Sequence, residues 1–336
     1  MGGSETLVVD LANRQCEYGH EVTLLVVNSD VDPALLSTLH KDVRIILLGR
    51  HPGSRNPLPL IRLNRRLACE RPDILHLHNL GLTGMILPWL RRHCLSTLHT
   101  TGIPLEKARG VHLVAISPTV AEDARGRHPG TEITVIPNSI DTAAIRQRED
   151  IADYRETLRI VQLGRLFPEV KGQDLLIKAL GILRRKTIEN VTADFIGSGE
   201  GRGTLETLAK EEGVADRVTF LDTLPRHETY SRLASYDLMV HPSRIEGFGL
   251  AVIEGMAAGL PVIVPDRGAP FEITDNGRFA TTFAYGDAPS LAENIEKCMA
   301  DYPAAHKRTE SAREYVCKHF SLDAMTRSYL QFYSKI

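Results

Sequence analysis

Two glutamates, Glu246 and Glu254, stand eight residues apart in the segment HPSRIEGFGLAVIEGMAAGLPVIVPDRGAP (241–270). Its pattern is typical of a strand, a glycine-containing loop, a helix and a second strand. Gly247 and Gly249 lack the Cβ atoms that keep a ligand away from the backbone, and the helix that follows begins with free N–H groups and a positive dipole end. Such a terminus favours a phosphate or another anion as its ligand.

The separation of the two carboxylates indicates one extended ligand. Eight helical residues span about 12 Å at ~1.5 Å per residue. Glu246, directly before the helix, can reach a hydroxylated group beside the phosphate, while Glu254 can reach the far end. A sugar and a ribose joined by a diphosphate fit this spacing. A glycosidase fits it poorly, because its two carboxylates lie roughly 5–9.5 Å apart.

Composition narrows the class of protein. The 336 residues suffice for two domains, and 43% apolar and 24% charged residues are typical of a soluble globular protein. A net charge of −2 provides no basic field for nucleic acid. Five scattered cysteines without a CxxC motif predict reduced thiols and a cytoplasmic protein. No run reaches the ~18–20 apolar residues of a membrane span.

Short apolar runs alternate with segments of helical period along the chain. The predicted strands are 21–27, 43–48, 73–78, 112–116, 133–137, 159–164, 192–197, 217–221, 237–241 and 260–265. Strands that are apolar on both faces predict parallel sheets covered by helices on both sides. We expect an α/β protein with two Rossmann-like doubly wound domains, 1–150 and 151–320. The polar stretch 146–156 would link them, and the terminal helix 321–336 would pack back on the first domain.

Open α/β sheets bind ligands at the carboxyl ends of their strands. The residues that suit chemistry do follow predicted strands. Arg165 and Lys171 follow 159–164, Gly199 follows 192–197, and His78 ends 73–78.

A series of short motifs runs through nearly the whole chain. They are GGSE (2–5), GHEV (19–22), DILHLHN (73–79), LHTTG (98–102), VAISP (114–118), VIPNSID (135–141), LGRLFPEVKG (163–172), FIGSGEG (195–201), VTFLD (218–222) and the segment 241–263. In this order they resemble the group 1 (family 4) glycosyltransferases of the GT-B fold. The resemblance implies a nucleotide-sugar donor held mainly by the second domain.

The resemblance also implies roles for single residues of the second domain. Arg165 and Lys171 would pair with the donor diphosphate, Glu246 would contact the sugar hydroxyls, and Glu254 the ribose. The other donor-binding positions would be Gly2, Gly3, Gly199, Gly247, Phe248, Gly249 and Leu250, with Asp222 and Leu224 near the base.

In the first domain, the resemblance places His78 near the anomeric carbon, as a catalytic residue together with Arg165, Lys171 and Glu246 of the second domain. His76 shares the strand face of His78 but lies deeper, as a hydrogen-bonded core histidine. The two histidines could also be read as metal ligands, but no third ligand is evident. His99 and Asn138 match acceptor-side motifs, and Ser139 replaces the usual glycine after Asn138.

The implied activity is transfer of a hexose-type sugar from a UDP- or GDP-linked donor to a hydroxyl of a glycan or lipid-linked acceptor. Retention of anomeric configuration, without metal or cofactor, is expected, with the two cations and the helix terminus stabilising the leaving diphosphate. Cell-surface polysaccharide or lipopolysaccharide synthesis is the expected setting. The alternatives are a GT-B-like sugar-nucleotide epimerase and a non-catalytic binding homologue. An oxidoreductase is disfavoured, because FIGSGEGRG departs from GxGxxG.

Two further expectations concern the first domain. The family normally has a strand before the GG-x-E helix, so we expect the first domain to lack its initial, central strand. The segment 57–71 carries Leu60, Leu63 and Leu67 beside three arginines (62, 65 and 66). This stripe suggests peripheral contact with the anionic inner face of the cell membrane, with an ordinary amphipathic surface helix as the alternative.

Overall fold

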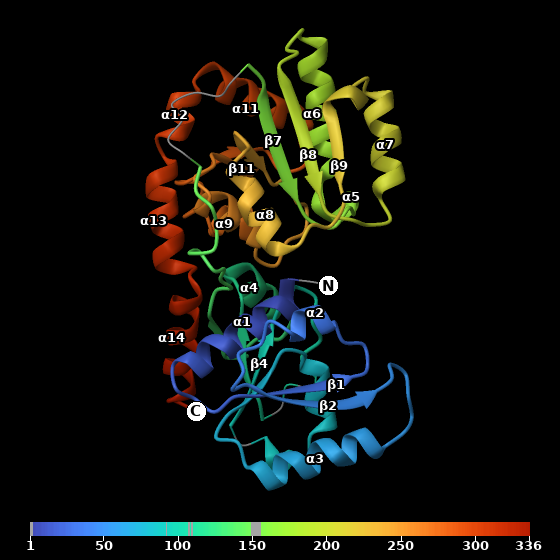
Figure 1. The fold of residues 1–336 in the computed structure, drawn as a ribbon, viewed down its shortest axis with the longest axis vertical. Coiled ribbons are helices and arrows are strands. Elements are labelled where there is room, and N and C mark those ends of the chain that lie inside the picture. Colours follow the sequence, from blue (N-terminus) through green and yellow to red (C-terminus); the bar gives the residue numbers. More distant parts are fainter. Residues whose placement is uncertain (1–2, 92, 107, 109, 149–155) are drawn as a thin grey trace. The chain divides into compact units, whose positions relative to one another are not determined.

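The computed structural model describes residues 3–91, 93–106, 108, 110–148 and 156–336. The chain forms two compact units: unit 1 is Met1–Ser139 with Leu322–Ile336, and unit 2 is Ile140–Ser321 (Figure 1). The expected boundary at 150 and most of the expected linker 146–156 lie outside the described residues.

Unit 2 contains one parallel sheet of six strands in the order β12-β11-β10-β7-β8-β9. The strands are β7 (Leu158–Leu163), β8 (Val191–Ile196), β9 (Val218–Leu221), β10 (Leu238–Val240), β11 (Val262–Pro265) and β12 (Thr281–Phe283). The order reverses between β7 and β10, which are neighbours. Unit 2 is therefore doubly wound, as the alternating pattern predicts, and has its topological switch point at the ends of β7 and β10.

Helices α5 to α10 lie between successive strands of this sheet, and α11 to α13 follow its last strand (Figure 1). They are α5 (Pro168–Lys171), α6 (Gln173–Arg185), α7 (Arg202–Glu211), η3 (Ala215–Arg217), α8 (Arg226–Leu233), α9 (Leu250–Ala257), α10 (Ala269–Glu272), α11 (Ala288–Ala300), α12 (Tyr302–His306) and α13 (Thr309–His319). The core forms where α6 and α11 lay their apolar faces on the sheet. Leu176, Leu180 and Leu183 of α6 are fully buried there, with Leu291 and Ile295 of α11.

Unit 1 is built from parallel strands in two separate sheets, β1–β2 and β3-β4-β5-β6. Its elements are α1 (Gly3–Glu17), β1 (Thr23–Asn28), α2 (Pro33–Leu36), β2 (Arg44–Arg50), α3 (Leu58–Glu70), β3 (Leu75–Leu77), η1 (Leu80–Met85), η2 (Pro88–Leu90), β4 (Cys94–Leu98), β5 (His112–Ala115), α4 (Pro118–Arg127), β6 (Ile133–Val135) and α14 (Leu322–Tyr333). A doubly wound domain would normally have one sheet. Here no described strand pairs with both β1 and β3, the position that a central strand would take.

The terminal helix α14 belongs to unit 1 and packs against α1. Leu7 and Leu11 of α1 share a buried cluster with Met325 and Tyr329 of α14 and with Leu95 of β4. This cluster covers one face of the four-stranded sheet.

The apolar stripe of helix α3, which suggested membrane contact, lies elsewhere in the structure than expected. Leu63 and Leu67 are buried in a cluster with Leu48 and Ile86, so the apolar stripe faces the core of unit 1. The prediction that this stripe rests on a membrane is wrong, because the same leucines close the hydrophobic core. Within the described part of the chain, no helix is both long and apolar enough to cross a membrane.

Candidate active site

The ends of β7 and β10 bring two loops of unit 2 together. The loop after β7 carries Arg165 and continues into α5, which ends at Lys171; the loop after β10 carries Glu246. Lys171 Nζ lies 2.6 Å from Glu246 Oε2. Sequence reasoning assigned these two residues to one site, and the structure brings them into direct contact at the switch point.

The Glu246 carboxylate is held by a second partner, His241. His241 Nε2 lies 3.1 Å from Glu246 Oε2, and the Ser243 hydroxyl lies 3.1 Å from the same nitrogen. Burial raises the pKa of Glu246, but the His241 hydrogen bond and the Lys171 charge outweigh burial and lower it to about 2. Glu246 is therefore an ionised acceptor at neutral pH.

Helix α9 begins beside this carboxylate without a side-chain cap. Its N-cap, Gly249, has φ +105, a conformation that L side chains rarely adopt. Gly249 provides no side-chain cap. Val252 N donates to Gly249 O at 2.9 Å, which leaves the N–H groups of Leu250 and Ala251 as candidates for an anion. Gly247 and Leu250 are partly exposed on either side, whereas Phe248 is buried against Phe320 and anchors the loop.

Glu254 lies further along α9, next to α8. Burial raises its pKa to about 7, although Arg226 and a hydrogen bond with Tyr230 act in the opposite direction. At neutral pH this carboxyl is poised between its two forms. It can accept hydrogen bonds from a ligand or donate one to it.

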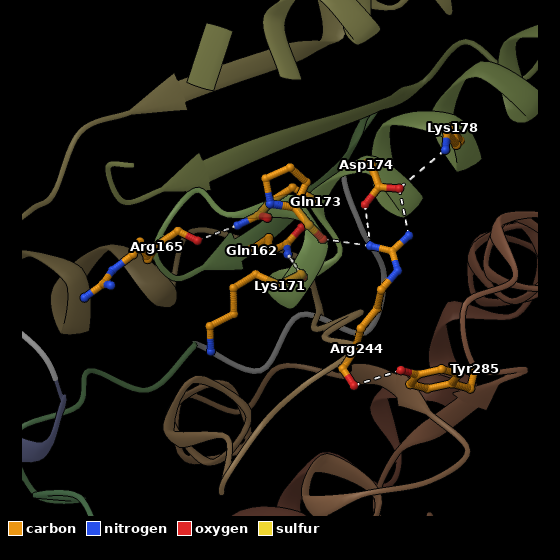
Figure 2. A network of polar contacts seen from close by, with 9 residues as sticks. Gln162, Arg165, Lys171, Gln173, Asp174, Lys178, Arg244 and Tyr285 are labelled. Atoms are coloured by element: carbon orange, nitrogen blue, oxygen red, sulfur yellow. Dashed lines mark hydrogen bonds and ion pairs between the residues drawn. The ribbon is translucent and has the colours of Figure 1, made fainter. Parts of the chain in front are cut away.

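The cationic side of the site is formed by two side chains with different surroundings. Figure 2 shows Arg165 and Lys171 extending from the same loop. The Arg165 carbonyl accepts a hydrogen bond from Gln173 Nε2 at 2.8 Å. Its exposed guanidinium forms no hydrogen bond or ion pair with any of the described residues. Lys171 is one-quarter exposed and paired. Arg165 is thus the cation that is free to meet an anionic ligand.

The remaining predicted donor positions of unit 2 are Gly199, Asp222 and Leu224. Gly199 is required by packing, because a Cβ there would lie 2.3 Å from Leu166 O. Asp222 is exposed and pairs with Arg202 at 2.9 Å, and Leu224 is partly buried. In unit 1, Gly3 begins α1, and Gly2 lies outside the described residues.

Unit 1 gathers three histidines at the ends of β3 and β4. His76 is hydrogen-bonded through both ring nitrogens, to Tyr333 Oη at 2.8 Å and to Thr97 Oγ1 at 2.7 Å. This confirms His76 as a hydrogen-bonded core residue, and it has no nitrogen left for a metal. His78 Nδ1 lies 3.2 Å from His99 Nε2. The His76 and His78 rings are tilted by 31° to each other, with centroids 4.1 Å apart.

Burial keeps this cluster neutral. It lowers the pKa of His76 to about 3 and that of His99 to about 4, and it holds the pKa of His78 well below its usual range. The predicted acceptor-side residue Asn138 is 6% exposed, and Ser139 beside it avoids the left-handed region and contacts Met325 Sδ at 3.3 Å. Within the described residues, Cys16, His40 and Asp42 form the single group spaced like metal ligands, and His76 and His78 are not part of it.

Sequence reasoning missed His241 and the pair Arg244–Asp174. His241 directly follows β10, five residues before Glu246, and that position is a signal that could have identified it. Arg244 and Asp174 meet only through the fold, since 70 residues separate them.

Comparison with known proteins decides the family. Residues 144–315 match the family described as "Glycosyl transferases group 1", and residues 1–144 match "Glycosyltransferase Family 4". This chain belongs to the group 1 glycosyltransferases. Its predicted GT-B fold is confirmed by solved structures: Anabaena HepE in complex with UDP-glucose has a TM-score of 0.83 at 19% identity, covering 100% of this chain and 97% of HepE.

Curated relatives of this glycosyltransferase include the following two proteins. The lipopolysaccharide core biosynthesis glycosyltransferase LpsE of Rhizobium meliloti is 28% identical over 98% of this chain and 95% of LpsE. The GDP-mannose-dependent alpha-(1-6)-phosphatidylinositol monomannoside mannosyltransferase of Mycobacterium tuberculosis is 26% identical over 83% of this chain and 74% of that enzyme.

Proposed function

We propose that this glycosyltransferase moves a hexose from a UDP- or GDP-linked donor to a hydroxyl of a glycan or lipid-linked acceptor, with retention and without a metal or cofactor. The observation that carries the proposal is the Lys171–Glu246 contact of 2.6 Å beside the uncapped N-terminus of α9. A cation, a helix N-terminus that suits an anion, and a carboxylate that can accept hydrogen bonds from sugar hydroxyls lie together here. A nucleotide diphosphate sugar requires these groups.

The chemistry assigned to unit 2 is stabilisation of the leaving group. Arg165, Lys171 and the N–H groups of α9 would hold the diphosphate and neutralise the charge that grows on it as the bond to the sugar breaks. Ionised Glu246 would accept hydrogen bonds from sugar hydroxyls, and Glu254 would contact the ribose. Asp222 and Leu224 would lie toward the base, and backbone groups of Gly247 and Phe248 toward the phosphate and sugar.

The chemistry assigned to unit 1 is different. His78 and His99 share one hydrogen bond and are neutral, so they can bind hydroxyl groups without attracting the phosphate. We assign His78 to the reacting sugar and His99 and Asn138 to the acceptor side. No carboxylate nucleophile is assigned, which favours front-face attack with the leaving diphosphate taking the acceptor proton.

A thermal-shift panel with UDP, GDP, ADP and CMP and their hexose conjugates tests the proposed donor. Ligand at 100 times Kd stabilises the folded protein by about 2.7 kcal/mol, which is several degrees at roughly 2–4 °C per kcal/mol. A selective shift with a UDP or GDP conjugate supports the proposal. Equal shifts with all four nucleotides, or a shift with none, would refute the proposed donor.

Product analysis separates transfer from its alternatives. NMR of the product should show the anomeric configuration of the donor, and EDTA should leave the rate unchanged. A changed donor sugar formed without acceptor would identify an epimerase. Binding without any product, across hydroxylated acceptors, would identify a non-catalytic homologue.

The proposed lipid-linked acceptor has structural support from a surface of unit 1. Leu58 and Ile61 on α3 and Trp89 on η2 are 53%, 58% and 72% exposed, and α3 contacts η2. Arginines 62 and 65 are exposed on the same helix. Residues 43–105 contain nine arginines and two acidic residues, although the whole chain has a net charge of −2. Apolar side chains next to this positive charge suit an anionic membrane.

Vesicle sedimentation tests this peripheral contact. The protein should sediment with phosphatidylcholine vesicles that contain phosphatidylglycerol, and less with phosphatidylcholine alone. Replacing Ile61 and Trp89 by serine should abolish sedimentation, whereas Tyr18→Ser, at another exposed aromatic of unit 1, should not. Protein that stays in the supernatant with anionic vesicles would refute membrane contact and leave the donor site untouched.

A further inference from the structure

Arg244 lies on the loop that carries Glu246, and its side chain reaches across to the loop that carries Lys171. Its guanidinium forms a two-pronged pair with Asp174, Nη1 to Oδ1 at 2.6 Å and Nη2 to Oδ2 at 2.8 Å (Figure 2). Nη1 also donates to Pro168 O at 2.7 Å. One planar group therefore binds the first turn of α6 and the first residue of α5 simultaneously.

Backbone contacts bring the same two loops close together. Val170 O accepts the N–H groups of Arg244, at 2.8 Å, and of Ile245, at 3.1 Å. At Gly172, a Cβ would lie 2.1 Å from Pro242 O, so the close approach requires glycine. These contacts do not involve the guanidinium, so they would survive its replacement.

Two buried glutamines complete the support of the cationic loop. Gln162 Nε2 donates to Lys171 O at 2.9 Å, and Gln173 Nε2 donates to Arg165 O at 2.8 Å (Figure 2). They fix the loop to β7 and α6, whereas Arg244 fixes it to the Glu246 loop. Arg244 and its partner Asp174 thus add a side-chain link to the backbone contacts between the loops that carry Lys171 and Glu246.

We propose that Arg244 and Asp174 are positioning residues of the donor site, which hold Lys171 at the distance from Glu246 that a nucleotide diphosphate sugar requires. This inference rests on the proposed function. Neither residue needs to touch the donor. A short helix of four residues cannot hold its own orientation, and displacement of a charged group by about 1 Å can cost 10²-fold in rate.

The Arg244–Asp174 ion pair is shielded from solvent enough to hold the two loops in place. Arg244 and Asp174 side chains are 26% and 16% exposed. Burial raises the pKa of Asp174, but the Arg244 fork outweighs burial and the pKa is lowered. Lys178 is a weaker partner of Asp174, at 3.4 Å. Lysine cannot replace Arg244, because a single ammonium cannot bind both Asp174 oxygens and Pro168 O in one plane.

Release of UDP from UDP-glucose and of GDP from GDP-mannose, measured at 25 °C, tests the proposal. Arg244→Lys and Asp174→Asn should each lower kcat/KM at least tenfold. The matched control is Arg184→Lys, which removes another arginine–aspartate pair of unit 2 (2.7 Å to Asp216) at the opposite end of α6. It should stay within twofold of wild type.

A double-mutant cycle distinguishes positioning from simple stabilisation. In a Lys171→Ala background, Arg244→Lys should cost less than threefold, because the group to be positioned is gone. A merely structural pair would cost the same factor in both backgrounds, and that result would overturn the proposal, as would a kcat/KM within threefold of wild type for Arg244→Lys. If Lys171→Ala and Glu246→Ala themselves have no effect on nucleotide release, the proposed function fails instead.

Discussion

The two units bury their polar side chains in opposite ways. Unit 2 buries ionised partners at its strand ends, with Lys171 2.6 Å from Glu246 and Arg244 forked onto Asp174. Unit 1 buries neutral rings at the corresponding ends of its strands, where burial lowers the pKa of His76 to about 3 and that of His99 to about 4.

This difference matches the chemistry proposed for each unit. A diphosphate is bound by fixed positive charge and by free N–H groups, which unit 2 supplies. A sugar or acceptor hydroxyl needs hydrogen-bond donors and acceptors without net charge, which neutral imidazoles supply.

The largest effect is expected from removing the charges of unit 2. Lys171→Ala should lower nucleotide release and transfer about 100-fold, equivalent to ~2.7 kcal/mol at 1.36 kcal/mol per tenfold, because a cation at the leaving phosphate is lost. Arg165→Ala and Glu246→Ala should each cost at least tenfold. Initial rates with the donor chosen by thermal shift provide the measurement, and an unchanged melting temperature shows that the fold persists. Near-wild-type rates would remove these residues from the site.

The next effect is a loss of stability of unit 1 as the pH is lowered. A histidine whose pKa is lowered by folding stabilises the protein above its unfolded pKa, near 6.5, and that stability is lost as pH falls toward the folded pKa. For His99, with a folded pKa of about 4, the loss by pH 5 should be about 1–2 kcal/mol. Hydrogen exchange of β4 and β5 amides between pH 7 and 5 measures it.

The control for this pH dependence is an exposed histidine of the same unit. His99→Gln should make the dependence shallower, whereas His20→Gln should leave it as in wild type. Equal slopes in all three proteins would show that His99 is not kept neutral by the fold, and the contrast between the units would be lost.

Unit 2 should respond to pH in the opposite direction through Glu254. Its folded pKa, about 7, lies above the ordinary 4.5, so the stability that it contributes is present below pH 4.5 and is lost as pH rises through 7. By pH 8 the free energy of unfolding should fall by about 1–3 kcal/mol relative to Glu254→Gln. Hydrogen exchange of β7 and β8 amides measures this. The exposed Glu211→Gln should retain the wild-type slope, and a slope unchanged by Glu254→Gln would contradict the shift.

Sequence patterns predicted the elements around Glu246 better than the contacts that support them. The segment from β10 to β11 could be predicted because apolar runs flank glycines at a helix start, and those residues are local in sequence. The Arg244–Asp174 contact could not be predicted, because several strands and helices of the chain lie between the two residues and only the fold brings them together. Strand β4 was missed because Ser96 and Thr97 interrupt its apolar run; Thr97 is buried through hydrogen bonds to His76 and Tyr329.

Helix α3 shows why a periodic pattern alone does not identify what covers a helix face. The leucine stripe that suggested a membrane faces the core of unit 1, and Leu58 and Ile61, which are exposed, were not part of it. The helical period of the sequence determines which residues share a face of the helix. Only the fold determines whether that face packs against protein or is exposed to solvent.

The smallest effect is expected at Tyr285, the outermost support of the charged network. Its hydroxyl donates to Arg244 O at 2.9 Å, and its side chain is otherwise largely exposed (Figure 2). Tyr285→Phe removes one neutral hydrogen bond, typically ~1 kcal/mol and less when exposed, so kcat/KM should fall only two- to threefold. The partner is the backbone carbonyl of residue 244, which Arg244→Lys keeps, so the same two- to threefold loss is expected in that background. A tenfold loss from Tyr285→Phe alone would instead mean that the hydroxyl contacts the donor, and the boundary between the ligand-binding charges of unit 2 and their supports would have to include Tyr285.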